Sequence, residues 1–169
     1  MKKLICLFCF TALLLNCGGS DDDNSSGTNN AKSFRAKIDG VDFIANEDLV
    51  YGFGVEENVP NPTLSIGGNA GDESNVRVIE ILIESDELLF SGQEINSDSQ
   101  SSYALANYYY LDGIINAWSE SDAVSYNLRI TEIDYENRLV SGEFNFIVFD
   151  DNTNETYIIT DGIFTNIDF

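Results

Sequence analysis

Apolar and polar residues alternate with a period of two along most of this chain, and this alternation is the feature that most constrains its fold. In the segment VRVIEILIES (76–85), three isoleucines fall on one side of an extended strand, and two glutamates share the other side with a valine and a leucine. The same period recurs in 125–134 and 139–150. After residue 33, no stretch of about 12 or more residues keeps a helical period. The pattern therefore predicts an all-β domain.

Short polar segments separate the expected strands. Asp39-Gly40 lies between two alternating runs, and this dipeptide favours a two-residue type I′ hairpin turn. Residues 135–138 and 151–155 are expected to be turns as well. About ten strands joined in this way are typical of an antiparallel β-sandwich, with a closed or partly open β-barrel as the alternative. We expect residues 34–169 to form this single domain.

Three details of the strand pattern are less regular. The segment NAGDESN (69–75) is rich in turn-forming residues and predicts a loop. The apolar segment LLFSG (88–92) predicts a further strand. Asp161-Gly162 interrupts the last alternating run, which predicts a break or a bulge in the final strand.

The start of the chain has the features of a cleaved signal. Two lysines precede the apolar run LICLFCFTALLL (4–15). This run would form a helix of about 18 Å, which is short of the roughly 30 Å of a bilayer core. Cys17 follows in the sequence LLNC, and the arrangement resembles the signal of bacterial lipoproteins. The resemblance implies that residues 1–16 are a signal peptide and that Cys17 carries a lipid.

Residues 17–33 then predict a flexible acidic tether, because they contain no large apolar side chain after the cysteine. The run Ser20, Asp21, Asp22 and Asp23 resembles the surface-export signal of Bacteroidota lipoproteins. The resemblance implies an outer-membrane lipoprotein displayed on the extracellular face, with the periplasmic face as the alternative. We expect membrane contact through the N-terminal lipid only.

The domain itself also resembles a known group of proteins. Its opening, FRAKIDGVDF (34–43), and its later segments VSGEFNF (140–146) and ITDGIF (159–164) are similar to motifs of small Bacteroidota lipoproteins. Those proteins belong to families of domains of unknown function. The motifs are hairpin and core features, so the resemblance implies a β-rich fold and no catalytic residue.

The composition excludes several kinds of chemistry. The chain has no histidine, and its only cysteine after the signal is Cys17, so catalytic triads with histidine and zinc sites with Cys or His ligands are excluded. Its formal net charge of −21, with only 8 Lys and Arg, argues against nucleic acid as a partner.

Carboxylates remain as candidate functional groups. Glu80 and Glu84 share one face of a strand, so a glycan hydrolase that uses only carboxylates is one alternative, and a solvated sheet face is the other. Asp150, Asn152 and Asn154 place oxygens at alternate positions. These three residues predict either a Ca²⁺ site, as in a calcium-stabilised structural or adhesion domain, or an ordinary hairpin turn. We expect no other cofactor.

Aromatic side chains are the remaining candidates for ligand contact. Trp118, Tyr108 and Tyr110 would stack on sugar rings if exposed, or contribute to the core if buried. The sequence thus favours a non-catalytic module, anchored by lipid, that binds a glycan or a protein.

Overall fold

The structure is a computed structural model that describes residues 31–54, 62–72, 75–99, 101–112, 115–117, 123–151 and 153–169. The expected signal peptide, the lipidated Cys17 and the acidic run 20–23 lie outside the described residues, as do Trp118 and Asn152.

Two antiparallel sheets contain the eleven strands of the described residues. Sheet A has the strand order β2 (Val41–Ile44), β1 (Ser33–Ile38), β11 (Glu155–Asp168), β10 (Leu139–Asp150), β9 (Ala123–Asp134) and β6 (Glu94–Asn96). Sheet B has the order β3 (Val50–Gly54), β4 (Thr63–Asp72), β5 (Asn75–Ser85), β7 (Ser102–Asp112) and β8 (Ile115–Ala117). A single 3₁₀ turn, η1 (Glu47–Leu49), precedes β3.

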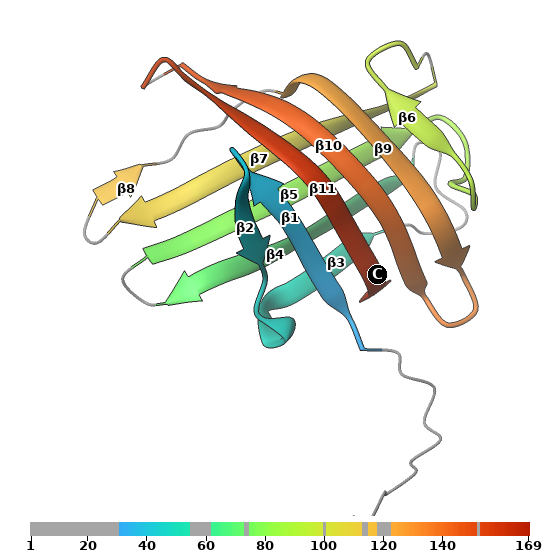
Figure 1. The fold of residues 1–169 in the computed structure, drawn as a ribbon. Helices are drawn as coiled ribbons and strands as arrows, with labels where there is room; N and C mark the ends of the chain where they lie inside the picture. Colours follow the sequence, from blue (N-terminus) through green and yellow to red (C-terminus); the bar gives the residue numbers. More distant parts are fainter. Residues whose placement is uncertain are drawn as a thin grey trace, which may run out of the picture.

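The predicted β-sandwich is confirmed. Figure 1 shows sheet A in front of sheet B, with the long strands of the two sheets running across one another rather than alongside. The sheets are separate hydrogen-bonded units, so the architecture is a sandwich and not a closed barrel. β6 and β8 have only three residues each, and the described strand count of eleven is close to the expected ten.

The core lies between the sheets and follows the alternation read from the sequence. Ile79, Ile81 and Ile83 on β5 are fully buried, with exposed fractions of 0%. Phe34, Phe144 and other apolar residues of sheet A face them in one continuous cluster. Each fully buried side chain of this size contributes roughly 1.5–3 kcal/mol, so the inward rows of the two sheets supply most of the stability.

The Asp39-Gly40 turn has the predicted geometry. Asp39 and Gly40 have φ angles of 51° and 81°, and Ile38 pairs with Val41 directly across the turn. Positive φ at both central residues is the signature of a type I′ hairpin. Asp39 also binds β11, because its backbone N–H donates to the Ile158 carbonyl at 2.9 Å and its Oδ1 accepts from the Ile158 N–H at 2.9 Å.

Two glycines on β10 and β11 each lie beneath a phenylalanine ring. Gly142 pairs with Phe164 and Gly162 pairs with Phe144. A Cβ atom would lie 2.3 Å from the Phe164 ring at Gly142, and 2.5 Å from the Phe144 ring at Gly162. The motifs in 140–146 and 159–164 therefore serve core packing. The predicted bulge at Asp161-Gly162 is confirmed, because the β10–β11 register shifts there and Asp161 has a φ of 52°.

Two expectations about the strands were wrong. Residues 69–72 continue β4 instead of forming a loop, because Asn69 to Asp72 pair without interruption with Val78 to Asn75. Residues 88–92 form no strand: they precede β6 and lead from sheet B to sheet A, with Leu89 buried. Gln93 supports this irregular segment, since its Oε1 accepts from the Phe90 N–H at 3.1 Å.

Candidate functional site

The two described tyrosines singled out from the sequence differ in exposure. Tyr108 is 6% exposed and its ring packs edge-on against the Tyr157 ring at 5.0 Å. Burial raises the pKa of the Tyr108 hydroxyl. Tyr108 is therefore a core residue, which corrects its assignment as a ligand contact. Tyr110 is 40% exposed near the end of β7, and Trp118 lies outside the described residues.

Two of the three residues considered for calcium, Asp150 and Asn154, lie at the β10–β11 hairpin. Asp150 is 3% exposed and its Oδ2 accepts a hydrogen bond of 2.8 Å from the Thr153 hydroxyl. Asp150 pairs with Glu155, and Asn154 has a φ of 57°. Asp150 and Asn154 therefore take part in the turn of this hairpin, and Asn152 lies outside the described residues. Among the described residues, no group of three or more Asp, Glu, His or Cys gathers where a metal ion would fit.

Glu80 and Glu84 lie on the outer face of sheet B, on the side of β5 opposite the buried isoleucines. Glu80 Oε1 accepts from the Ser65 hydroxyl at 3.2 Å, and Glu84 Oε2 accepts a short hydrogen bond from the Tyr103 hydroxyl. Four residues along a strand separate the two Cα atoms by about 13 Å. The two carboxylates thus lie on an open sheet and do not face each other across a cleft.

Aromatic and apolar side chains surround these carboxylates. We call this surface the tyrosine face, and its members project outward from β3, β4, β5 and β7: Tyr51, Phe53, Ser65, Gly67, Val78, Glu80, Leu82, Glu84, Tyr103, Leu105, Asn107 and Tyr109. Three of its large side chains are well exposed, namely Phe53 at 64%, Tyr103 at 45% and Leu105 at 39%. Gly67 is buried, and the other side chains of this face are half-buried. Apolar side chains at this density are unusual on a solvated sheet face.

Tyr51 lies over Gly67 on this face. The two residues are direct partners in the β3–β4 register, and a Cβ atom at Gly67 would lie 2.6 Å from the Tyr51 hydroxyl oxygen and 2.7 Å from Cζ. The ring therefore occupies the space that a side chain at Gly67 would fill. Tyr51 also contacts Phe53, with 5.7 Å between ring centroids.

Glu80 and Tyr109 both influence the pKa of Tyr51. Burial, followed by the negative charge of Glu80 and by Tyr109, raises the pKa of Tyr51 to about 12. The register explains the proximity, since Tyr51, Gly67, Glu80 and Asn107 form one row across four strands. This row joins an aromatic ring, a carboxylate and an amide.

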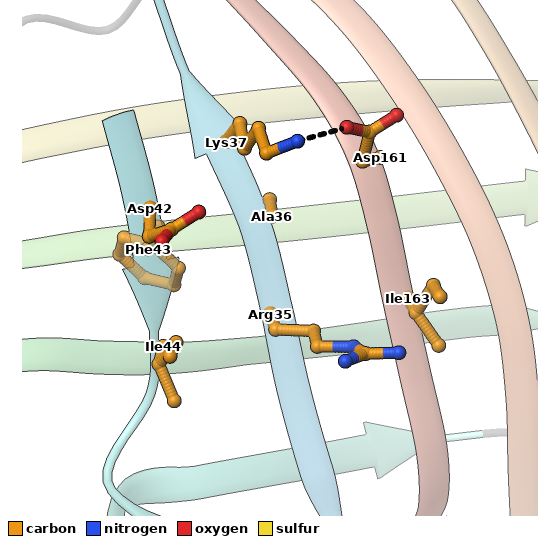
Figure 2. A pocket seen from close by; sticks show the side chains of 8 residues that line it. All are labelled: Arg35, Ala36, Lys37, Asp42, Phe43, Ile44, Asp161 and Ile163. Atoms are coloured by element: carbon orange, nitrogen blue, oxygen red, sulfur yellow. Dashed lines mark hydrogen bonds and ion pairs between the residues drawn. The ribbon is translucent and has the colours of Figure 1, made fainter. Parts of the chain in front are cut away.

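The outer face of sheet A contains a second candidate, a hollow of about 370 Å³ over β1 (Figure 2). Lys37 reaches from β1 to Asp161 on β11, and its Nζ lies 2.8 Å from Asp161 Oδ2. This hydrogen bond raises the pKa of Lys37. Arg35 extends from the same strand beside Ile163, and Ile44 borders the hollow from β2 (Figure 2). The ion pair spans the upper part of this hollow in the view of Figure 2.

Comparison of the chain with known proteins identifies no relative. No protein-family model, no curated protein and no solved structure matches the chain. Within the part of the chain that the structure describes, no helix has the length and apolar character needed to span a membrane.

The sequence alone missed the central residues of the tyrosine face. Tyr51, Phe53 and Tyr103 come from strands that pair only through long-range register. One signal was available: once the isoleucines of β5 face inward, Val78 and Leu82 must face outward beside the glutamates. An apolar row on the solvent side indicates a binding surface.

Proposed function

We propose that this protein is a lipid-anchored module of the bacterial cell envelope, displayed on the outer surface, that binds a glycan without catalysis. The binding surface in this proposal is the tyrosine face. The lipoprotein signal ending at Cys17, the acidic run after it and the motifs of the Bacteroidota lipoprotein families support the location.

The observation that carries the proposal is the position of Tyr51 over Gly67, beside Glu80. Glycan recognition combines stacking of a sugar ring on an aromatic side chain with hydrogen bonds from hydroxyls to carboxylates and amides. The tyrosine face supplies these groups on a broad sheet surface. The open arrangement of Glu80 and Glu84 gives no support to a hydrolase, which needs two carboxyl groups roughly 5–9.5 Å apart across a bound sugar.

A protein ligand is the second candidate. Phe53 and Leu105 are exposed apolar side chains in one cross-strand row with Leu82. Interface cores are enriched in aromatic and apolar groups of this kind. A calcium-stabilised structural role would rest on the Asp150 turn, where Asp150 Oδ2 accepts a hydrogen bond from the Thr153 hydroxyl.

The experiment is a binding screen of the native lipidated protein, purified in detergent, against a glycan array. We expect binding to at least one glycan, and at least tenfold weaker binding for Tyr51→Ala. Tyr110→Ala is the matched control, because Tyr110 is an exposed tyrosine that is not part of the tyrosine face. Binding that Tyr51→Ala leaves intact, or turnover of a glycan, would contradict the proposal.

A further inference from the structure

We infer that the ligand of the tyrosine face is an uncharged polysaccharide, bound across the strands on the row formed by Tyr51, Glu80 and Asn107. This inference rests on the proposed function and adds the chemical class of the ligand.

The Tyr51 ring provides a surface on which a sugar ring can stack. The Tyr51 ring lies over Gly67, where a side chain would otherwise separate the ring from the sheet. The ring also contacts Phe53, with 5.7 Å between the ring centroids. The C–H face of a pyranose ring packs against an aromatic ring held in this way without needing any charge. An aromatic ring fixed by its neighbours also loses little side-chain entropy when a ligand binds.

Glu80 and Asn107 provide the hydrogen-bonding groups beside this ring. Glu80 and Asn107 are direct partners in the β5–β7 register, so their Cβ atoms lie about 4.5–5.5 Å apart. A carboxylate only accepts hydrogen bonds, whereas an amide both donates and accepts. Such a pair matches two neighbouring hydroxyls on one sugar ring. Ser65 donates to Glu80 Oε1 at 3.2 Å and so orients the carboxylate.

The tyrosine face and the chain as a whole are negatively charged. Among the described side chains that project outward from β3, β4, β5 and β7, none is Lys or Arg, and two are glutamates. The whole chain has a formal net charge of −21. A polysaccharide with carboxylate or sulfate groups would meet repulsion from the site and from the domain, and the described outward side chains of these strands include no Lys or Arg to offset it. The face therefore selects against anionic glycans.

The hydrogen-bond donors to Glu80 and Glu84 favour a neutral glycan over a cationic protein as the ligand. Among the described residues, Glu80 and Glu84 accept hydrogen bonds from uncharged hydroxyls, those of Ser65 and Tyr103. A sugar hydroxyl is a donor of the same chemistry and can join these carboxylates. A cationic partner would instead depend on the charge of Glu80, and its binding would weaken as salt increases.

The test is affinity electrophoresis of the native lipidated protein in detergent, in gels that contain one polymer at a time. The neutral probes are hydroxyethyl cellulose, galactomannan, xyloglucan and dextran. The anionic probes are carboxymethyl cellulose, polygalacturonate and dextran sulfate, and poly-lysine serves as the cationic probe. We expect retardation by at least one neutral polymer, little change between low and high salt, and no retardation by its anionic counterpart.

Variants locate the interaction. Tyr51→Ala should weaken retardation at least tenfold, Tyr51→Phe should keep most of it because the ring remains, and Glu80→Ala should weaken it severalfold. Circular dichroism of each variant checks that the fold is retained. Tyr110→Ala, the exposed tyrosine outside the tyrosine face, should behave as the wild type.

The outcomes separate the inference from the proposed function. Tyr51-dependent binding to an anionic polymer would overturn the neutral class while leaving glycan binding intact. Salt-sensitive binding to poly-lysine alone, lost in Glu80→Gln, would overturn it in favour of a cationic protein. No retardation by any of the neutral polymers overturns the inference, and glycan binding as a whole fails if the array is negative as well.

Discussion

The outer faces of the two sheets differ in how their charged side chains are arranged. On sheet A, charged groups lie near partners of opposite sign: Lys37 binds Asp161 at 2.8 Å. On sheet B, Glu80 and Glu84 accept from the uncharged hydroxyls of Ser65 and Tyr103 among the described residues, and large aromatic side chains lie near them. Among the described residues, the outer face of sheet A therefore contains an internal ion pair, whereas the outward side chains of sheet B include two glutamates and no Lys or Arg. The difference indicates that the tyrosine face is the one suited to a ligand.

Cross-strand register strengthens this contrast. On sheet A, a row runs from Arg35 through Ile163, Glu143 and Arg129 to Glu94, so that charges of opposite sign alternate along it. Such pairs contribute roughly 0.2–1 kcal/mol each. The equivalent rows of sheet B contain no cation among the described outward side chains. The outer face of sheet A also exposes Ile44, Ile147 and Ile158, so the two faces differ in the arrangement of their charges rather than in apolar character.

The largest expected effect is a loss of unfolding free energy when a side chain on the buried face of sheet B is shortened. Ile81→Ala should lower the free energy of unfolding by about 2–5 kcal/mol, because Ile81 is fully buried between the sheets. Leu82→Ala, one residue further along β5, should lower it by about 1 kcal/mol or less, since Leu82 is half-exposed on the tyrosine face. Urea denaturation of the two variants measures the difference.

Equal losses for these two neighbours would break the comparison. A loss at Leu82 as large as that at Ile81 would mean that the tyrosine face is covered in solution, for example by a second copy of the chain. Sedimentation of the wild type at several concentrations would then identify the cover.

The next effect concerns the contact between Tyr51 and Gly67. Gly67→Ala should destabilise the fold by about 1–3 kcal/mol, because the new methyl group would lie 2.6 Å from the Tyr51 hydroxyl oxygen and 2.8 Å from the Ile79 carbonyl oxygen. In the double variant with Tyr51→Ala, the ring clash is absent and part of the loss should be recovered. Urea denaturation of the four proteins gives the coupling energy, and strict additivity would show that the ring does not rest on Gly67.

Much of the fold followed from local sequence. The period of β5 predicted which isoleucines are buried, and Asp39-Gly40 predicted the first hairpin. The errors arose where tertiary pairing overrides local preference. Residues 69–72 have loop-like composition, yet their pairing with β5 keeps them extended. Residues 88–92 are strand-like, but this part of the chain leads from sheet B to sheet A.

The site was much less accessible to sequence reasoning. Tyr108 and Tyr110 were chosen because aromatic residues cluster there, but β7 buries Tyr108 between the sheets. Tyr51 becomes notable only through its register with Gly67, which lies 16 residues further along the chain by residue number. Periodicity assigns residues to the two faces of a strand, but it does not specify which strand pairs with which. Long-range register therefore limits how much of a surface can be read from sequence.

A smaller effect concerns the titration of Tyr51. Burial and the charge of Glu80 raise its pKa to about 12, so the folded state holds the neutral phenol more strongly than the unfolded state, where the pKa is near 10.0. The stabilisation from this shift is complete below pH 10 and is lost as the pH rises towards 12. Ultraviolet absorbance of phenolate, compared between the wild type and Tyr51→Phe, isolates this group. Glu80→Gln should lower the pKa of Tyr51, and an unchanged value would place Glu80 away from the ring.

The smallest expected effect lies on the opposite face. Lys37 and Asp161 are both exposed, so water and salt screen their attraction, and Lys37→Met should change the urea midpoint very little. Because the pKa of Lys37 is raised, any contribution is present below its usual value of 10.5 and is lost at higher pH. High salt should remove the remaining difference from the wild type. A large loss of stability, or a loss of glycan binding in Lys37→Met, would instead assign the functional surface to sheet A and reverse the comparison between the two faces.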